Sequence, residues 1–481
     1  MKRASLTGLL LIPLSGCVVG PNYKQPAAPI PPTFKEAALV TADGWKPGEP
    51  NDAALKEDWW TSYQDPTLNA LEAQVDTANQ TLQAAAANFR AARAQIGSAR
   101  SNEAPTMSVG QGVSSVRDSA NQPYFNKNYA NNGSGSLTLP VDLNYEIDLW
   151  GRIRRGVTAA REAAQASDAD LENARLSLHA ELAMDYFGAR SDDAQSKLLA
   201  DTVKAYKAAL KLTRDRYDGG AAPLSDVTQA QTQLNQAQVQ LTDLGVQRAE
   251  YEHAIAVLIG KPPAEFIVPA LPLNQNGPTL PSIPGIVPAT LLERRPDIAA
   301  EERRMAAANE QIGIAQAAFY PTLSLSAIAG LQGTSALNWF TWPSRFWAVG
   351  PSLSETVFDA GRRRAAKNIT MAEYDSDVAN YRQTVLTAFQ QVEDNLAALR
   401  ILNTEATEQH AATASAEQSL DLFQTRYEGG VDTYLQVITW QTAALNNERN
   451  DIYIMQRRLD ASVLFVKALG GGWNRTQLPR L

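Results

Sequence analysis

The pentapeptide Arg-Tyr-Asp-Gly-Gly at residues 216–220 returns as Arg-Tyr-Glu-Gly-Gly at residues 426–430, and this repetition decides the fold. Each copy follows a long segment rich in Ala, Leu, Gln, Glu and Arg, which favour helix. Glycine suits the left-handed position that ends a helix, and Ser225 or Asp226 can cap the helix that follows. We therefore expect each copy to be the tip of a helical hairpin.

The same offset of 210 residues relates other parts of the chain, such as Gly151 and Gly361, whereas upstream the offset is 216, as between Gly97 and Gly313. The chain is therefore a duplicated unit, with a loop of different length in each copy between the two markers. Long helices are expected from Thr158 to about Tyr217, from about Asp226 to Ile259, from about Ala365 to Tyr427 and from about Leu435 to Leu469. Helices far longer than the globular mean of about 11–12 residues favour coiled packing, and a plain long coiled coil is the alternative.

Proline separates the two units, with eight prolines between residues 262 and 288. Proline fixes φ and lacks a donor, so this stretch is expected to be extended. The predicted organisation is a signal peptide (1–16), an extended acylated tail (17–60), a first repeat (61–261, hairpin about 104–150), a Pro-rich equatorial linker (262–290), a second repeat (291–472, hairpin about 320–359) and a C-terminal tail (473–481).

Apolar and polar residues alternate strictly over residues 137–149, which predicts a strand with one apolar face. This length exceeds the roughly 9–11 residues that cross a bilayer at a tilt. Pro140 indicates a strand end or bulge nearby. Further strands are expected from Met107 to Val113, over 323–329 and over 347–357, with aromatic residues around them as in an interfacial girdle. A soluble two-sheet domain is the alternative.

Two hairpins supply four strands per chain, and about eight is the small end for a closed barrel. In lipid an open sheet edge leaves backbone groups unpaired at several kcal/mol each. If the strands lie in a membrane, the protein must therefore oligomerise. Two copies would give a barrel with a packed interior, and three would leave more room inside. The sequence alone does not decide between a dimer and a trimer.

The N-terminus has a basic start, a short apolar core and then Leu-Ser-Gly before Cys17, the single Cys of the chain. It resembles a bacterial lipoprotein signal, in which the Cys becomes the acylated, palmitate-carrying N-terminus. Val18 follows, rather than the Asp of an inner-membrane retention signal, so outer-membrane sorting is implied. An ordinary cleaved signal with a chance Cys is the alternative.

Composition excludes several classes of protein. A net charge of −8 argues against nucleic-acid binding. One Cys and three widely spaced His suggest no metal site. Beyond the first dozen residues no apolar run approaches a membrane-spanning helix. No dinucleotide, phosphate-loop, zinc-protease or Ser/His/Asp motif is present, so we expect no enzyme and no cofactor beyond the covalent lipid.

Basic residues follow the last strand of each unit, at a helix start where cations oppose the helix dipole. We expect them to contact phospholipid head groups, with a solvated basic turn as the alternative. They are Arg152, Arg154 and Arg155 in the first unit and Arg362, Arg363 and Arg364 in the second.

Taken together, the motifs resemble the lipoprotein branch, often called NodT-like, of the TolC-type outer-membrane factors. The residues that carry the resemblance are Leu14–Cys17, Asp58–Trp60, Tyr145–Arg152, the two Arg-Tyr-x-Gly-Gly tips, Leu291–Ile298 and Ala468–Trp473. The resemblance implies an α+β membrane protein: a homotrimer whose chains share a twelve-stranded transmembrane barrel and a long α-helical barrel. Such a trimer would be the exit duct of a tripartite efflux pump, with a periplasmic adaptor at the tips and an inner-membrane pump, most often of the resistance-nodulation-division class.

The resemblance also places a gate at the tips, where an acidic ring would attract cations. Asp432 matches such a position, whereas Gln436 and Thr439 replace further acids of related proteins. The gate candidates are Asp432, Asp226, Arg426, Tyr427, Arg216 and Tyr217, and the adaptor-docking candidates are Gly219, Gly220, Gly429 and Gly430. Alternatively, the Arg-Tyr pairs are C-terminal helix packing and Asp226 is an N-cap. Rival functions are a duct for type I protein secretion and a lipid-anchored coiled-coil scaffold without a pore.

Overall fold

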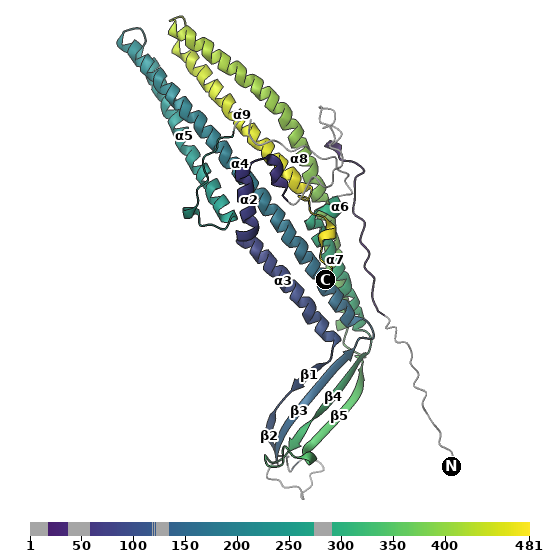
Figure 1. Cartoon of the computed structure of the whole chain (residues 1–481). Helices are drawn as coiled ribbons and strands as arrows, with labels where there is room; N and C mark the ends of the chain where they lie inside the picture. Colours follow the sequence, from purple (N-terminus) through teal and green to yellow (C-terminus); the bar gives the residue numbers. More distant parts are fainter. Residues whose placement is uncertain (1–17, 37–57, 118, 120, 122–133, 274–290) are drawn as a thin grey trace, which may run out of the picture.

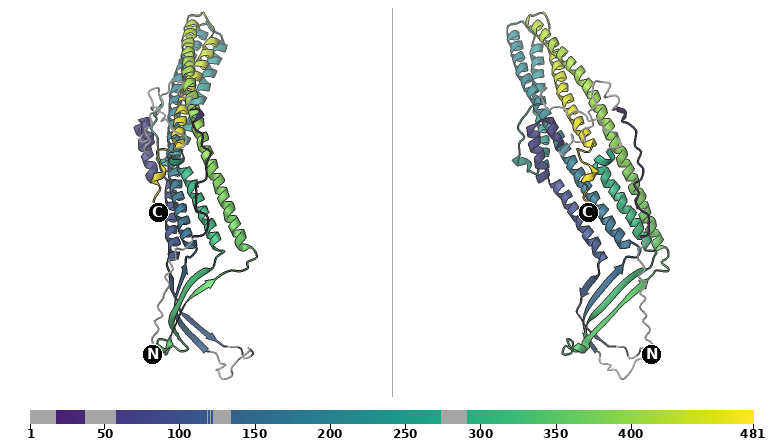
Figure 2. Two further views of the ribbon diagram at one scale, coloured as in Figure 1. Left: turned by 90° about the vertical axis from the view of Figure 1, so that its right-hand side faces the viewer. Right: turned by 45° about the vertical axis from the view of Figure 1, so that its right-hand side comes forward.

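The computed structural model describes residues 18–36, 58–117, 119, 121, 134–273 and 291–481. The molecule is elongated, with a small sheet at one end and two helical hairpin tips at the other (Figure 1). Figure 2 shows that the helices form a slab, narrow in one view and broad in the other. Cys17, the predicted signal peptide and most of the Pro-rich linker lie outside the described residues.

The helices are α2 (Pro66–Ala78), α3 (Gln80–Arg100), α4 (Arg152–Asp218), α5 (Leu224–Leu258), α6 (Leu291–Arg294), α7 (Pro296–Ala317), α8 (Arg362–Glu428) and α9 (Tyr434–Ala468). Short 3-10 turns are η1 (Trp59–Tyr63), η2 (Ser101–Glu103), η3 (Pro263–Glu265), η5 (Trp342–Ser344) and η6 (Arg475–Gln477). The strands are β1 (Thr106–Val109), β2 (Gly112–Val116), β3 (Ser134–Ile147), β4 (Thr322–Gly333) and β5 (Arg345–Ser354).

The predicted duplication is confirmed. Helices α4 and α8 have 67 residues each and α5 and α9 have 35 each, and both pairs begin 210 residues apart. At 1.5 Å per residue α4 and α8 are each about 100 Å long. Within each repeat the long helix packs on its hairpin partner, α4 on α5 and α8 on α9, and α4 also packs on α7 and α9 of the other repeat. Among the described residues, none of the helices is both long and apolar enough to cross a lipid bilayer.

The sheet is antiparallel, and its two middle strands come from different repeats. Strand β3 pairs with β4 from Leu137 opposite Gly333 to Ile147 opposite Leu323. On its other edge β3 pairs with β1 and β2 in turn, and β5 completes the sheet beside β4. Since β1 and β2 follow one edge of β3, the four strand positions expected from the sequence are present. Within the part of the chain that the structure describes, the two outer edges of the sheet are unpaired.

Pro140 explains why that edge is split into β1 and β2. The Gly110 N–H donates to the Pro140 carbonyl at 3.0 Å. Proline has no N–H to return to Gly110, so the ladder lapses between Val109 and Gly112. The strand end expected near Pro140 thus occurs in the neighbouring strand, and β3 itself runs on through Pro140. In the second unit the strand expected over 347–357 extends too far, because β5 ends at Ser354.

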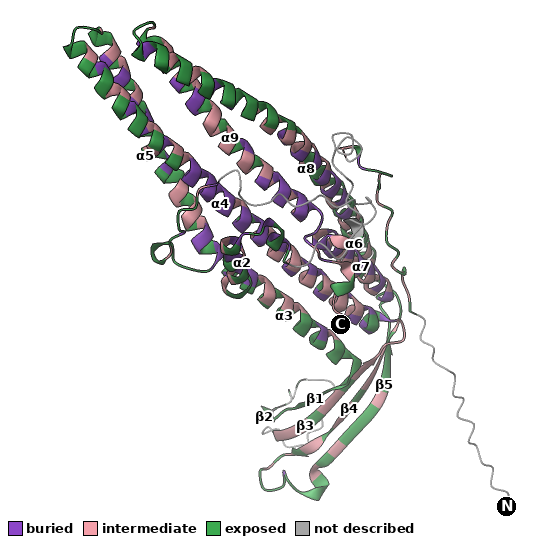
Figure 3. Ribbon diagram, turned by 45° about the horizontal axis from the view of Figure 1, so that its top comes forward, coloured by how far each residue is buried: buried purple, intermediate pink, exposed green. Residues whose placement is uncertain are grey.

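Buried residues concentrate along the middle of the long helices (Figure 3). One cluster unites Trp59, Trp60 and Tyr63 with α4, α5 and α9, and another joins Phe34 to α7, α8 and α9. Segment 18–36 is held beside α7 and α8, with Tyr23 donating to Glu302 at 3.0 Å. The core therefore fixes the two repeats to each other at mid-length and leaves the tips and the sheet projecting.

Candidate functional site: the paired hairpin tips

The two tips share one backbone geometry. Gly220 and Gly430 have φ of 74° and 75°, the left-handed region that glycine adopts without steric cost. The next residue closes each turn onto the helix, since Ala221 N–H donates to Arg216 O at 2.8 Å and Val431 N–H to Arg426 O at 2.9 Å. The prediction that the Gly-Gly pairs end the helices is confirmed. The predicted cap is wrong: α5 begins at Leu224, so Ser225 and Asp226 lie inside its first turn.

Arg216 joins the two tips. Its guanidinium donates to the carbonyl oxygens of Tyr427 at 2.7 Å and Glu428 at 3.1 Å, and lies 4.7 Å from the Tyr427 ring centroid. These are among the last carbonyls of α8, where the helix dipole favours a cation. The structure thus brings together Arg216 and Tyr427, which the sequence singled out 211 positions apart.

Arg426, the counterpart of Arg216, is placed differently. Its Nε lies 3.1 Å from the Asp432 carboxylate, which also accepts from the Thr433 N–H at 3.0 Å. The Arg426 side chain is 56% exposed. An ion pair this open contributes only about 0–1 kcal/mol, so Arg426 is free to exchange its partner.

Tyr434 is a member of the site that sequence reasoning missed. It is buried against Tyr427, with ring centroids 5.2 Å apart. Burial raises the pKa of Tyr434 to about 12, and the nearby Tyr427, Tyr206 and Asp226 act in the same direction. Asp226 therefore acts electrostatically on this cluster, whereas Tyr217 is exposed. The sequence did contain a signal for Tyr434. Its counterpart in the first repeat is the apolar Leu224, so both repeats carry a large hydrophobic side chain at this position.

The basic residues at the sheet end already have carboxylate partners. Arg152 pairs with Glu146 at 2.6 Å, and Arg154 with Asp148 at 3.2 Å. Arg363 likewise pairs with Asp359 at 2.7 Å. Asp148 and Asp359 also accept N–H groups of the first helical turns, which offsets the dipole cost of the cations. Arg362 and Arg364 are exposed.

Arg155 corrects the expectation of a lipid contact. Its side chain is buried, pairs with Glu310 at 2.7 Å and donates to Val19 O at 2.8 Å. The guanidinium crosses to α7 over Gly313, where an added Cβ would lie 2.4 Å from Arg155. A buried, paired cation cannot reach a head group, so Arg155 joins the two repeats instead.

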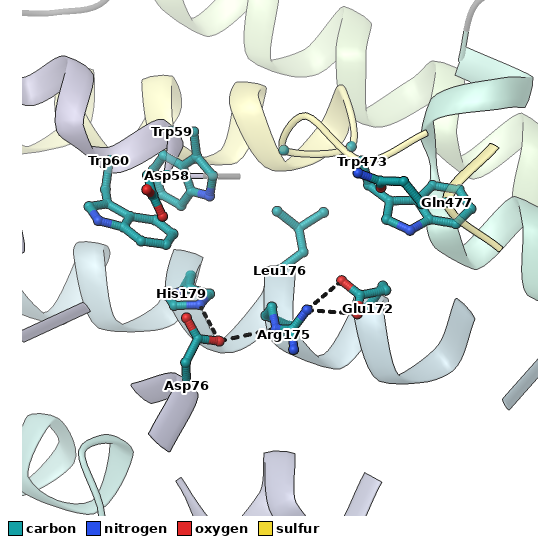
Figure 4. A pocket seen from close by; sticks show the side chains of 12 residues that line it. Asp58, Trp59, Trp60, Asp76, Glu172, Arg175, Leu176, His179, Trp473 and Gln477 are labelled. Carbon is teal, nitrogen blue, oxygen red and sulfur yellow. Dashed lines mark hydrogen bonds and ion pairs between the residues drawn. The ribbon is translucent and has the colours of Figure 1, made fainter. Parts of the chain in front are cut away.

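Two of the sequence motifs meet in a cavity of about 300 Å³ at mid-length (Figure 4). Asp58, Trp59 and Trp60 line it together with Gly470, Gly471 and Trp473. Beneath them His179 stacks on Trp60 with ring centroids 4.3 Å apart.

His179 is held by acids from α2, at 2.6 Å from Glu72 and 3.4 Å from Asp76, and Asp76 also pairs with Arg175. Burial lowers the pKa of His179, but the bonds to Asp76 and Glu72 outweigh it and raise the pKa to about 9. Sequence reasoning missed this cluster because His179 lies 107 positions from Glu72.

A third motif, Leu291–Ile298, contacts the C-terminal end of α9 through Arg295. Arg295 pairs with Asp297 at 2.6 Å and donates to Ala468 O at 3.0 Å. Gly470, with φ of 93°, lies so close to Arg294 O that an added Cβ would be 2.0 Å away. The Leu291–Ile298 and Ala468–Trp473 motifs therefore build one mid-length junction.

A family model described as outer membrane efflux protein matches residues 69–261 and 287–471. The chain belongs to this family. The probable efflux pump outer membrane protein SepC of Pseudomonas putida is 32% identical over 482 residues, 98% of each chain. Outer membrane protein OprJ of Pseudomonas aeruginosa is 32% identical over 468 residues, 97% of this chain and 95% of OprJ.

Among solved structures, the outer-membrane channel OprN superposes with a TM-score of 0.87 at 27% identity, covering 95% of this chain and 100% of OprN. The family resemblance, the fold class and the outer-membrane location inferred from the sequence are thereby confirmed. The chain therefore functions in efflux, as a member of a family of outer-membrane channels.

Proposed function

We propose that three copies of this outer membrane efflux protein form the exit duct of a tripartite pump. The observation that carries the proposal is the sheet, whose β1/β2 and β5 edges have no partner among the described residues of the chain. Unpaired backbone groups are costly in lipid, so the edges of neighbouring copies are expected to pair. Three copies supply more strands than the roughly eight that fill their own interior, and so leave an aqueous passage.

The lipid anchor proposed at Cys17 fits the position of the next residues. Val19 N–H donates to Trp150 O at 3.1 Å, and Val18 packs on Gly151, where the sheet meets α4. Residue 18 therefore lies at the sheet end that would face the periplasmic leaflet. A palmitate-carrying Cys17 would enter that leaflet, and exposed Arg362 and Arg364 would meet head groups there.

The tips would dock a periplasmic adaptor and hold the gate. Apart from their chain neighbours, no described atom lies within 4 Å of a Cβ built on Gly220 or Gly430, so these glycines present an open surface. With Gly219 and Gly429 they would contact the adaptor, and an inner-membrane pump of the resistance-nodulation-division class would supply energy. Gating would use Arg216, Tyr427, Arg426, Asp432, Asp226 and Tyr217.

Small toxic organic compounds are the proposed cargo. Similar proteins of Pseudomonas putida are named toluene efflux pump outer membrane protein TtgF and antibiotic efflux pump outer membrane protein ArpC. The duct itself would do no chemistry. It would provide a water-filled path and leave the choice of compound mainly to the pump.

Native mass spectrometry and planar-bilayer recording of the purified acylated protein test this proposal. We expect a trimer that conducts, and a deletion strain that becomes sensitive to toluene and antibiotics. Asp432→Ala should lower cation selectivity, because an acidic ring attracts cations. Gln436→Ala, on the same tip, is the matched control and should not change selectivity. A monomer that passes no current would contradict the proposal and favour a scaffold.

A further inference from the structure

The mid-length cavity contains hydrogen-bonding groups that the fold itself does not use. Two of the tryptophans that line it, Trp59 and Trp473, are 4% and 7% exposed. Among the described residues, none accepts a hydrogen bond from either indole N–H, whereas Trp150 donates to the Pro321 carbonyl at 2.7 Å. A buried tryptophan N–H normally has a partner. Two exceptions on the wall of one cavity therefore point to a ligand that accepts hydrogen bonds.

Both indole nitrogens face the cavity and are held in place. Neither nitrogen is sealed off from solvent, although the rings that carry them are buried. Figure 4 shows each nitrogen on the side of its ring that is turned toward Arg175. Trp59 packs edge-to-face on Tyr63, and the Trp473 backbone N–H donates to the Gly470 carbonyl at 3.0 Å. The two donors are thus positioned before a ligand arrives, which lowers the entropy cost of binding.

Carboxylates line the same cavity. Asp58 does not cap η1 with its side chain, so its carboxylate is available to a ligand. Glu172 and Asp76 hold Arg175 at 2.7 Å and 3.0 Å. A carboxylate has about four acceptor sites and a guanidinium has five N–H donors, so these paired groups can still bind a ligand. Leu176 adds an apolar surface beside them.

This mixture of groups disfavours a charged ligand. An anion would lie beside the Asp58 and Glu172 carboxylates. A cation would lie beside Arg175 and would leave both indole N–H groups without an acceptor. Unmatched polar or charged groups cost free energy when a ligand buries them. A neutral ligand rich in hydroxyl groups avoids these costs, because each hydroxyl donates one hydrogen bond and accepts others.

We propose that the mid-length cavity is a saccharide-binding site. Hydroxyl oxygens of the sugar accept from the indole N–H groups of Trp59 and Trp473. Other hydroxyl groups donate to Asp58 and Glu172, and the C–H face of the ring covers Leu176. The volume of about 300 Å³ is at the small end for ligand pockets, so it suits one or two sugar rings. This site is separate from the tips and the sheet, on which the proposed duct depends.

Isothermal titration of the full acylated protein with cellobiose, chitobiose and maltose tests the site, in a detergent that has no sugar head group. At least one of the three sugars should bind. Trp473→Phe keeps an aromatic ring but removes the donor, and should weaken that binding by roughly tenfold. Trp440→Phe is the matched control, because Trp440 stacks on Phe423 instead, and it should leave the affinity unchanged.

The charge of the ligand is tested by Asp58→Asn, which removes a negative charge but keeps an acceptor. Saccharide affinity should then change by less than about threefold. Tetramethylammonium is the cationic probe and should not bind to the wild-type protein. If tetramethylammonium binds in place of the sugars and is lost in Asp58→Asn, the cavity is a cation site and the proposal is overturned.

Beads of cellulose and chitin distinguish two sources of the sugar. Retention on the beads, with release by the free disaccharide, would assign the site to a glycan chain, and binding of the free disaccharide alone would assign it to a soluble sugar. A folded wild-type protein that binds none of the three sugars would overturn the proposal, as would equal weakening by Trp473→Phe and Trp440→Phe. The duct would stand in either case, since assembly and conductance are measured without sugar.

Discussion

Arg155 and Arg364 both lie in basic clusters at the start of a long helix, yet one is buried and the other exposed. The difference depends on Glu310, which lies 155 positions from Arg155 in the chain. Local charge patterning could predict a cationic turn but not this partner. His179 was overlooked for the same reason, since its acids come from a different helix. The tip residues were found because repetition marks them within a single short segment.

His179 predicts how stability depends on pH. It titrates near 6.5 when unfolded and at about 9 in the fold. Its contribution is therefore fully present below pH 6.5 and is lost as pH rises through about 9. Burial raises the pKa of Glu72 to about 7, which likewise favours the fold at lower pH.

We expect Tm to fall by several degrees between pH 6.5 and 9.5, and His179→Gln to flatten that slope. The exposed His253 is the control, and His253→Gln should keep the wild-type profile. An unchanged slope in His179→Gln would contradict the assignment.

At the scale of elements, the alternation of apolar and polar residues predicted the strands, and the Gly-Gly pairs predicted the helix ends. Both patterns reflect local backbone chemistry. The predicted long helices were nearly correct in extent, and the β3 alternation was read correctly through Pro140. The N-cap at Ser225 or Asp226 was wrong because Pro223 precedes the helix and its side chain offers no acceptor. Which helices meet was not predictable, since α4 contacts α7 and α9 of the other repeat.

The two glycines of one tip should respond differently to alanine. Gly430 has φ of 75°, where a Cβ costs about 1–2 kcal/mol, whereas Gly429 has φ of −72°. Gly430→Ala should speed hydrogen exchange of the Val431 amide by roughly tenfold, because the turn that protects it is strained. Gly429→Ala should leave that rate nearly unchanged. Equal rates in the two variants would show that the turn does not need the left-handed conformation.

The repeat also predicts the register between copies. Leu139 pairs with Leu331 across β3 and β4. The counterparts of these two residues are Val349 in β5 and Ser115 in β2. Oxidation of a Val349→Cys, Ser115→Cys protein should therefore produce disulfide-linked trimers on a denaturing gel. Val349→Cys with Ser114→Cys is the control, because the neighbouring side chain points to the other face of the sheet. Stronger linking in the control would shift the register by one residue.

At the scale of the whole molecule, the duplication is what relates the sheet, the mid-length junctions and the tips. Gly313 accommodates Arg155, which joins the two repeats. Apart from its own helix, no described atom lies within 4 Å of a Cβ built on the counterpart Gly97. In the described part of the single chain, surface is therefore left uncovered at the tips, around Gly97 and at the sheet edges. Sequence reasoning reached the need for several copies through strand number, and the structure adds which surfaces they would share.

The two unpaired sheet edges also bear on inheritance. In the proposed trimer, a copy whose β5 edge is blocked, for instance by proline, would still present an intact β1/β2 edge and recruit normal copies. A ring that includes it cannot close. In a cell that expresses both alleles, the defective product would therefore inactivate normal subunits, and the lesion would behave as genetically dominant.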